Sequence, residues 1–276
     1  MIYIVFAPPK TGKTLYLVLK ANEYAFDIER NRAMKNDLIK LQKMGFEKIK
    51  TIPDCCVSSN FDMTFKKFRH NDRKPRRINP YRLGFSNKFV KTHFNFAYES
   101  IFITEAQKYL NSRMSLYFPD WQSRWYEAHE HDFLTIFLDT QRPMLIDSNI
   151  RELSKFIEVI GFKRTYNNLG KFLKIEIETR VIDNDGLFKI YIDSGKKDKN
   201  CYTTIKETFF VDPFNMYDCR SCKPKFLEGH FDEDIDYKKS FVPEETFDAY
   251  VKYLTENDDE LPNKFYVKRS KVNEGT

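Results

Sequence analysis

The feature that most constrains this chain is a short apolar run that leads directly into a Gly-Lys-Thr sequence. Residues 2–6 read Ile-Tyr-Ile-Val-Phe, a β-branched and aromatic run that is typical of a buried strand. The following loop ends Gly-Lys-Thr, and apolar residues at helical spacing come next. A strand, such a loop and a helix are the order found where a chain binds the phosphates of a nucleotide. The candidate binding residues are Pro8, Pro9, Lys10, Thr11, Gly12, Lys13 and Thr14.

The residue types in this loop fit a nucleoside triphosphate. Backbone N–H groups and the positive end of the helix dipole would face the phosphates. Lys13 would reach the β- and γ-phosphates, and the Thr14 hydroxyl would hold Mg²⁺. Ala7 stands where the pattern GxxxxGK[ST] has glycine, so the loop is expected to need no positive φ there. ATP and Mg²⁺ are therefore the expected cofactors.

Two further apolar runs are followed by polar side chains. Residues 100–103 lead into Thr104 and Glu105, and residues 133–138 lead towards Gln141. Strands that alternate with helices predict an α/β fold, a P-loop NTPase with a mostly parallel sheet covered by helices. Ligands bind at the carboxyl ends of such strands, so the three polar ends should meet. Helical patterns cover residues 13–30, 33–44, 106–111 and 119–129.

The two polar strand ends suggest roles in hydrolysis. Glu105 would be the catalytic base that polarises water. Thr104 stands where aspartate is usual; its hydroxyl could hold a metal-bound water but brings no negative charge. Gln141 suits a sensor of the γ-phosphate or of the attacking water. A strand that happens to end in Thr-Glu, and a loop glutamine before an Arg-Pro turn, are the structural alternatives.

A catalytic arginine is also expected, because ring-forming nucleotidases place one against the γ-phosphate of the neighbouring subunit. The candidates are Arg113, Arg124 and Arg151, and we choose Arg113. Each of these arginines could equally be a surface or structural residue.

The sequence pattern changes after residue 151. Apolar residues alternate with polar ones and predict an antiparallel β extension over residues 157–211. Its strands are expected at 157–164, 172–182, 187–192 and 203–211, with a hairpin turn at 183–186 (Asp-Asn-Asp-Gly). We place one ATPase domain at residues 1–227, which includes this extension and a basic insertion at 62–93, followed by an acidic segment at 228–276.

The formal net charge of +6 hides a strong asymmetry along the chain. The segment from Lys66 to Lys91 is rich in lysine and arginine and contains a single acid, Asp72, and aromatic residues lie among its cations. This composition suits a track for DNA phosphates with platforms for stacked bases. A solvated insertion, or one that docks on the acidic C-terminal third of a neighbour, explains it equally well.

Composition also limits the environment and the metal chemistry. No run of about 20 apolar residues could span a bilayer, and no basic region precedes the apolar start, so we expect a soluble, cytoplasmic protein. The five cysteines predict reduced thiols rather than disulfides. Two groups of residues have the types that bind metals: Cys201, Cys219, Cys222 and His230 for zinc, and His129 with His131 for another metal. Their loose spacing favours structural roles instead.

Several motifs occur together in a set order. The N-terminal strand and loop come first, then residues 103–107 (Ile-Thr-Glu-Ala-Gln) and Arg113, residues 129–132 (His-Glu-His-Asp), and residues 140–147 with 150–152. In this order they resemble the N-terminal domain of zonula occludens toxin-like (Zot) proteins. That family includes the filamentous-phage assembly ATPase and is similar to the FtsK/HerA class of DNA motors. The resemblance spans residues 1–161 and extends more weakly to 218.

The resemblance implies an ATPase that forms a homo-oligomeric ring and couples hydrolysis to moving phage DNA in virion assembly, export or genome packaging. It assigns Lys13 and Thr14 to the phosphate loop, Glu105 to the second motif and Gln141 to the sensor. It also implies capsid or assembly-protein partners, and a location in the host cytoplasm, peripheral at the inner membrane or at the virion assembly site.

Departures from the family pattern keep two alternatives open. The family has glycine at the positions of Ala7 and Lys10 and aspartate at that of Thr104, and its filamentous-phage members carry a transmembrane segment. One alternative is a non-hydrolysing nucleotide-binding scaffold of a phage assembly complex. The other is a DNA-binding adaptor with a vestigial nucleotide site.

Overall fold

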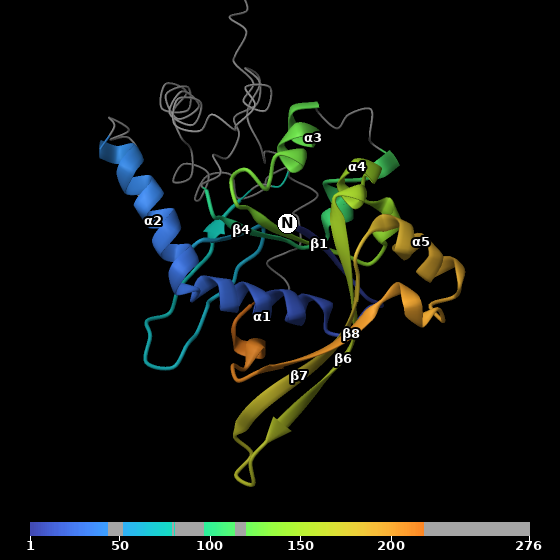
Figure 1. The fold of residues 1–276 in the computed structure, drawn as a ribbon. Helices are drawn as coiled ribbons and strands as arrows, with labels where there is room; N and C mark the ends of the chain where they lie inside the picture. Colours follow the sequence, from blue (N-terminus) through green and yellow to red (C-terminus); the bar gives the residue numbers. More distant parts are fainter. Residues whose placement is uncertain (44–51, 79, 81–96, 114–119, 218–276) are drawn as a thin grey trace, which may run out of the picture.

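One sheet organises the fold of the computed structural model, which describes residues 1–43, 52–78, 80, 97–113 and 120–217 (Figure 1). Within these residues eight strands pair in the order β3-β2-β4-β5-β1-β6-β7-β8. The strands are β1 (Ile2–Phe6), β2 (Val57–Ser59), β3 (Arg76–Arg77), β4 (Ser100–Ile103), β5 (Thr135–Thr140), β6 (Ser154–Tyr166), β7 (Phe172–Ile182) and β8 (Thr203–Phe209).

The strands from β3 to β6 are parallel, whereas β7 pairs antiparallel with β6 and β8 antiparallel with β7. Every residue of β4 and β5 is buried, as the near-continuous apolar runs of a sheet covered on both faces require. β1 lies between β5 and β6, near the middle of the eight-stranded sheet. The expected α/β class, with a mostly parallel sheet extended by antiparallel strands, is confirmed.

Helices flank both sides of the sheet, with α1 on one side and α3 and α4 on the other (Figure 1). The α-helices are α1 (Lys13–Ala25), α2 (Ile28–Lys43), α3 (Asp120–Glu127), α4 (Ser148–Glu152) and α5 (Asp185–Asp193). Single 3₁₀ turns are η2 (Ala106–Lys108), η4 (Pro143–Leu145), η5 (Lys199–Cys201) and η6 (Pro213–Asn215). The helix expected over residues 106–111 is thus only the turn η2.

The first helix ends earlier than its apolar pattern predicts. The chain leaves α1 after Ala25, and Asp27 starts α2, since its carboxylate accepts a hydrogen bond of 3.0 Å from the backbone N–H of Arg30. An aspartate in this position satisfies a backbone donor that the first helical turn leaves unpaired. The prediction of one helix over 13–30 and a second from residue 33 is therefore wrong by several residues.

The strand predicted over residues 187–192 is also wrong, because this segment belongs to helix α5. The side chain of Asn184 accepts a hydrogen bond from the backbone N–H of Leu187, so the 183–186 sequence caps a helix instead of forming a hairpin turn. Phe188 and Tyr191 are buried, and the ring of Phe188 stacks on Phe156 of β6 at 4.1 Å. The turn between β6 and β7 lies at residues 167–171 instead.

Aromatic side chains fill the space between α1 and the sheet. Phe137 of β5 stacks on Tyr3 of β1 and on Phe102 of β4, each at 4.8 Å between ring centroids, and Tyr24 of α1 meets Phe102 and Phe137. These contacts fix α1, and with it the loop before α1, against the three central strands.

Some expectations fall on residues that the structure does not describe. These are the acidic segment 228–276, residues 79 and 81–93 of the basic insertion, and Cys219, Cys222 and His230 of the proposed zinc site. Cys55, Cys56 and Cys201 are buried free thiols. None of the described helices combines the length and the apolar composition that a membrane span needs.

Candidate functional site

The candidate site begins at the loop between β1 and α1, whose geometry explains its residue types. Gly12 has φ +98°, and a Cβ atom there would lie 2.6 Å from Cδ1 of Phe162 on β6, so only glycine fits. Lys10 has φ +66°, a left-handed conformation in a residue that carries a side chain. Ala7 is buried and is not among the positive-φ residues, so alanine fits the backbone at this position without strain.

The first turn of α1 presents backbone donors to this loop. No side chain caps the helix at Gly12, so its first N–H groups point towards the loop without a side-chain acceptor. The Thr11 hydroxyl donates 2.7 Å to the carbonyl of Pro8 and closes the loop on itself. Pro8, Pro9 and Lys10 are exposed, whereas Lys13 is buried. Such a helix start is suited to an anion.

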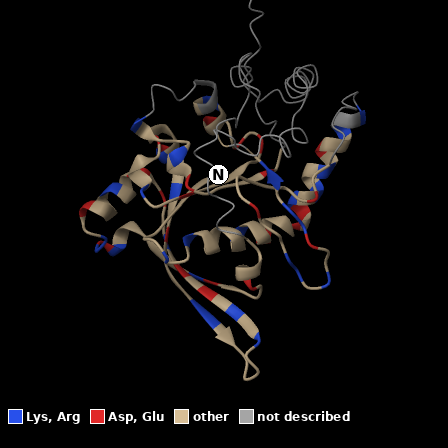
Figure 2. Cartoon of the chain, turned by 180° about the vertical axis from the view of Figure 1, so that it is seen from behind, with Lys and Arg blue, Asp and Glu red and all other residues tan. Residues whose placement is uncertain are grey.

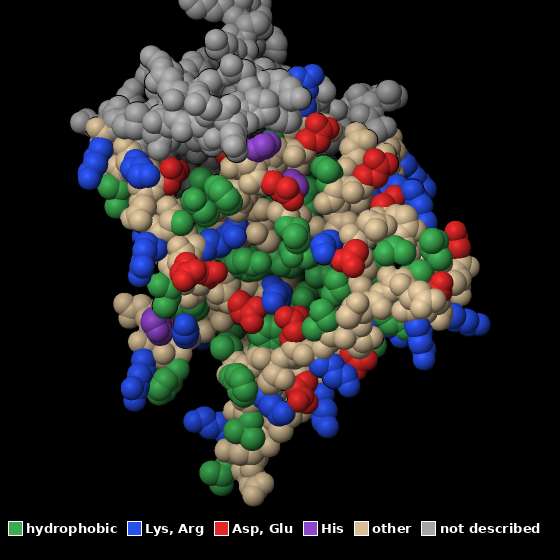
Figure 3. Space-filling model, viewed as in Figure 1, with side chains coloured by type: hydrophobic (Ala, Val, Ile, Leu, Met, Phe, Trp, Pro, Cys, Tyr) green, Lys and Arg blue, Asp and Glu red, His purple; other side chains and the backbone are tan. Residues whose placement is uncertain are grey.

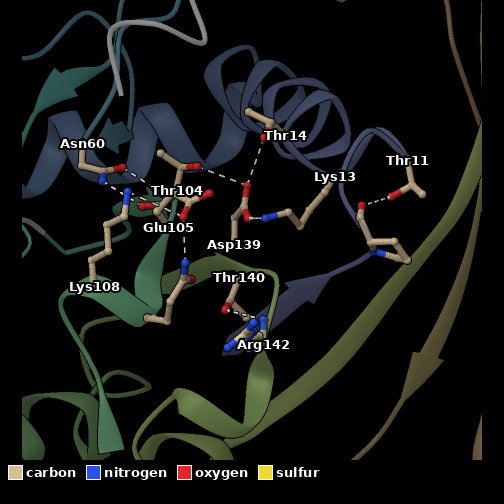
Figure 4. Close-up of polar contacts among 12 residues, drawn as sticks. Thr11, Lys13, Thr14, Asn60, Thr104, Glu105, Lys108, Asp139, Thr140 and Arg142 are labelled. Carbon is tan, nitrogen blue, oxygen red and sulfur yellow. Dashed lines mark hydrogen bonds and ion pairs between the residues drawn. The ribbon is translucent and has the colours of Figure 1, made fainter. Parts of the chain in front are cut away.

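Lys13 and Thr14 both contact Asp139, a residue to which the sequence analysis assigned no role. The Lys13 ammonium donates to Oδ1 of Asp139, and the Thr14 hydroxyl donates to Oδ2 at 3.2 Å (Figure 4). Asp139 is completely buried in β5, which lies between β1 and β4. Burial raises the pKa of Asp139, and the neighbouring Lys13 acts in the opposite direction.

Thr104 lies on the other side of the same carboxylate. Its hydroxyl donates 3.2 Å to Oδ2 of Asp139. The side chain of Asn60, just after β2, holds the backbone of Thr104 from both sides: its amide donates 3.1 Å to the carbonyl, and its oxygen accepts 2.9 Å from the N–H. The missing acid at position 104 is thus matched by an acid on the neighbouring strand.

Glu105 follows Thr104 with a strained backbone. Its φ of +55° is uncommon for a residue with a side chain, and such outliers cluster at active sites. Its carboxylate accepts 2.7 Å from the side-chain amide of Gln107 and lies 3.7 Å from the ammonium of Lys108 (Figure 4). Glu105 is partly exposed and is therefore accessible to water.

The other predicted catalytic residues are not joined to this group. Gln141 follows β5 as predicted, but its side chain is exposed, and no contact among the described residues links it to Asp139. The side chain of Arg113 is exposed, as is required of a residue that acts on a neighbouring subunit. Arg124 is also exposed, whereas Arg151 is buried and lies 3.7 Å from Asp185.

The oxygen atoms around Asp139 fit Mg²⁺. Mg²⁺ is bound in nucleotide enzymes by one or two carboxylates, with water and phosphate oxygens completing its coordination. Asp139 supplies one carboxylate, and the hydroxyls of Thr14 and Thr104 converge on its Oδ2. No group of three or more His, Cys, Asp or Glu side chains that could hold a metal occurs in the described part of the chain. These protein donors would hold a metal ion only together with phosphate oxygens.

His129 has structural contacts. Its Nδ1 lies 2.7 Å from the carbonyl of Tyr126, so this nitrogen carries the proton in the neutral ring. Burial lowers the pKa of His129 to about 4.

The described part of the basic insertion divides into two groups of cations. Three arginines bind partners within the fold. Arg73 donates to the carbonyl of Ala25 at 2.5 Å, Arg76 pairs with Glu99 at 2.5 Å, and Arg77 pairs with Asp62 at 3.3 Å. The exposed cations lie in the loop between β2 and β3, seen from behind in Figure 2: Lys66, Lys67, Arg69 and Lys74. We call these four residues the basic loop.

No family model matches this sequence, and no curated protein matches it. Among solved structures the chain is similar to the N-terminal domain of zonular occludens toxin from Neisseria meningitidis, with 17% sequence identity and a TM-score of 0.41. The match covers 79% of this chain and 98% of that domain. At this identity and this TM-score the similarity carries no argument about residue roles.

Proposed function

We propose that this chain is a P-loop ATPase that binds ATP with Mg²⁺ and powers the movement of phage DNA in virion assembly, export or genome packaging. One observation carries the nucleotide part of the proposal: Lys13 and Thr14, at the start of α1, both contact Asp139 at the end of the neighbouring strand. The cation, the hydroxyl, the carboxylate and the uncapped helix start are the groups that a metal-bound triphosphate requires.

Binding would redistribute the charges around Asp139. Lys13 would turn from Asp139 to the β- and γ-phosphates, which leaves a completely buried carboxylate without its cation. A buried charge needs a partner, so Asp139 would then face Mg²⁺ together with the Thr14 hydroxyl. Asp139 would in this way supply the negative charge that Thr104 lacks. Nucleotide affinity is therefore expected to depend strongly on Mg²⁺.

Glu105 is the group best suited to activate water. Its carboxylate is partly exposed, and hydrogen bonding to Gln107 fixes its orientation. It would accept a proton from the attacking water, while bound Mg²⁺ would neutralise charge on the phosphate oxygens. Gln141 would sense the γ-phosphate, and Arg113 would act on a neighbouring subunit in a ring.

The DNA part of the proposal is supported by the basic loop, whose four cations are exposed. Exposed lysine and arginine side chains bind nucleic acid through its phosphates, with an affinity that falls as salt rises. The order of motifs along the chain, which resembles that of phage assembly ATPases, supports the same role.

Steady-state ATP hydrolysis tests the enzymatic proposal. The wild-type protein should release phosphate, and Lys13→Ala and Glu105→Gln should each reduce the rate at least about 100-fold, as expected when a phosphate-binding cation or a general base is lost. Lys189→Ala on α5 is the matched control and should leave the rate unchanged, since Lys189 is half exposed and pairs with Asp185.

Thr104 gives a specific reason to keep the non-hydrolysing scaffold as a second candidate. ATP binding by the wild type without phosphate release would favour that scaffold over the motor. DNA binding that persists unchanged in Lys13→Ala, with no nucleotide binding by the wild type, would favour the DNA-binding adaptor.

A further inference from the structure

The orientation of a bound nucleotide follows from the sheet order, if the proposed function is accepted. Asp139, Thr104 and Glu105 belong to β5 and to the end of β4, which lie on one side of β1. These groups act at the γ-phosphate, so the γ-phosphate points to that side. The ribose and the base must then leave the loop on the opposite side of β1, and the strand there is β6. In Figure 4, Asp139 and Thr104 lie to one side of Lys13 and the outer loop with Thr11 to the other.

β6 presents an aromatic side chain at this position. The ring of Phe162 touches the loop at Gly12, because a Cβ atom there would lie 2.6 Å from it. Phe162 is nevertheless 39% exposed, so part of its ring is open to solvent beside the phosphate loop. Its place beside the phosphate loop, rather than its exposure alone, sets it apart, because an open aromatic face can stack on a planar ligand.

Neighbouring groups hold this aromatic surface in place. Phe214 of η6 meets Phe162 at 6.3 Å between centroids. The guanidinium of Arg164, on the same face of β6, lies 4.1 Å from the Phe214 centroid and 3.5 Å from the Asp212 carboxylate. A ring fixed before binding loses little entropy when a ligand stacks on it. Figure 3 shows hydrophobic and basic side chains side by side on the ribbon formed by β6 and β7.

We propose that Phe162, supported by Arg164 and Phe214, is the platform on which the base of the bound nucleotide stacks. Stacking recognises the face of a base and is tolerant of its identity. The platform would therefore contribute to affinity for any purine nucleotide, without reading the edge of the base. Phe162 would thus have two roles, stacking on the base and covering Gly12.

The test compares two ligands, each with Mg²⁺, by isothermal titration calorimetry: ATP, and inorganic tripolyphosphate, which has no base. Phe162→Leu keeps an apolar cover on Gly12 and removes the aromatic face. It should weaken ATP binding about tenfold, as expected for the loss of one stacked base, and change tripolyphosphate binding less than twofold. Phe162→Trp should retain ATP binding, as should Phe68→Ala, a control at an aromatic residue that is 83% exposed and lies away from β6.

The outcomes separate this inference from the proposed function. Unchanged ATP affinity in Phe162→Leu would overturn the platform, and so would equal weakening of both ligands, which would mean that Phe162 only supports the loop. If the wild-type protein binds neither ligand, the proposed function itself fails, and the platform fails with it.

Discussion

Replacing Asp139 by asparagine should strongly destabilise the nucleotide-free protein. The side chains of Lys13 and Asp139 are 9% and 0% exposed, so the substitution leaves a buried ammonium ion without a counter-charge. Breaking a buried ion pair from one side costs about 3–5 kcal/mol of unfolding free energy. For a protein of this size that is a fall of about 10 °C in melting temperature. Lys13→Met should have a similar effect, because it leaves the carboxylate alone.

Removing both charges together should restore most of the loss. Burial raises the pKa of Asp139 even with Lys13 beside it, which means that the pair does not fully offset the cost of its own desolvation. The Lys13→Met/Asp139→Asn double variant should therefore melt within about 4 °C of the wild type. Thermal unfolding followed by circular dichroism, without nucleotide, measures all four proteins as a double-mutant cycle.

An exposed ion pair provides the matched control. Lys155 and Asp183 form an ion pair at 2.7 Å, but their side chains are 38% and 63% exposed. Lys155→Met and Asp183→Asn should each change the unfolding free energy by less than about 1 kcal/mol. The reasoning is refuted if Asp139→Asn melts within 2 °C of the wild type, or if the effects of Lys13→Met and Asp139→Asn simply add in the double variant.

Three further predictions concern the loop, a buried histidine and the basic loop. Gly12→Ala should lower the unfolding free energy by about 2–4 kcal/mol, because the added methyl group meets Phe162 and the backbone has a φ of +98°. The control Gly170→Ala, at φ +72° in open space, should lose only about 1 kcal/mol. Equal losses of the two variants in urea denaturation would contradict this. His129 has a pKa of about 4 when folded, below its ordinary value of 6.5, so its contribution is present above pH 6.5 and is lost as the pH falls towards 4. This loss amounts to about 3 kcal/mol, and His129→Gln should flatten the pH profile of stability over that range; an unchanged profile would show that another group titrates. Alanine at all four positions of the basic loop should weaken binding to single-stranded DNA and reduce the slope of log affinity against log salt by about 3, measured by fluorescence anisotropy; an unchanged slope would place the DNA elsewhere.

The central strands and the phosphate loop could be predicted from the sequence because their signals are local. β1, β4 and β5 are apolar runs that any parallel sheet buries, and the Gly-Lys-Thr sequence lies directly before a helix. The carboxyl ends of these strands meet because parallel strands share an edge. For the same reason Thr104 contacts the carboxylate that Lys13 and Thr14 also contact.

Asp139 could not be assigned in the same way. A single carboxylate near the end of an apolar run looks like the first exposed residue after a strand. Its role depends on Lys13, 126 residues away, and on the position of β5 between β1 and β4. The sequence does contain one signal, the place of Asp139 directly after an apolar run. An acid buried in a strand needs a cation nearby.

The misassigned segments have local causes. Residues 187–192 alternate well enough to be read as a strand, but Phe188 and Tyr191 also fit one face of a helix, and the Asn184 cap decides between them. The apolar pattern of α1 continues through Phe26, so only the hydrogen bond made by Asp27 marks the start of α2.

Equilibrium binding of ATP to the wild-type protein, measured by calorimetry with Mg²⁺ and with EDTA, tests the central claim most directly. The arrangement of Lys13, Thr14 and Asp139 predicts saturable binding of one ATP per chain, strongly weakened by EDTA and abolished in Lys13→Ala. Absence of binding, or binding that neither EDTA nor Lys13→Ala affects, would contradict the assignment of this site.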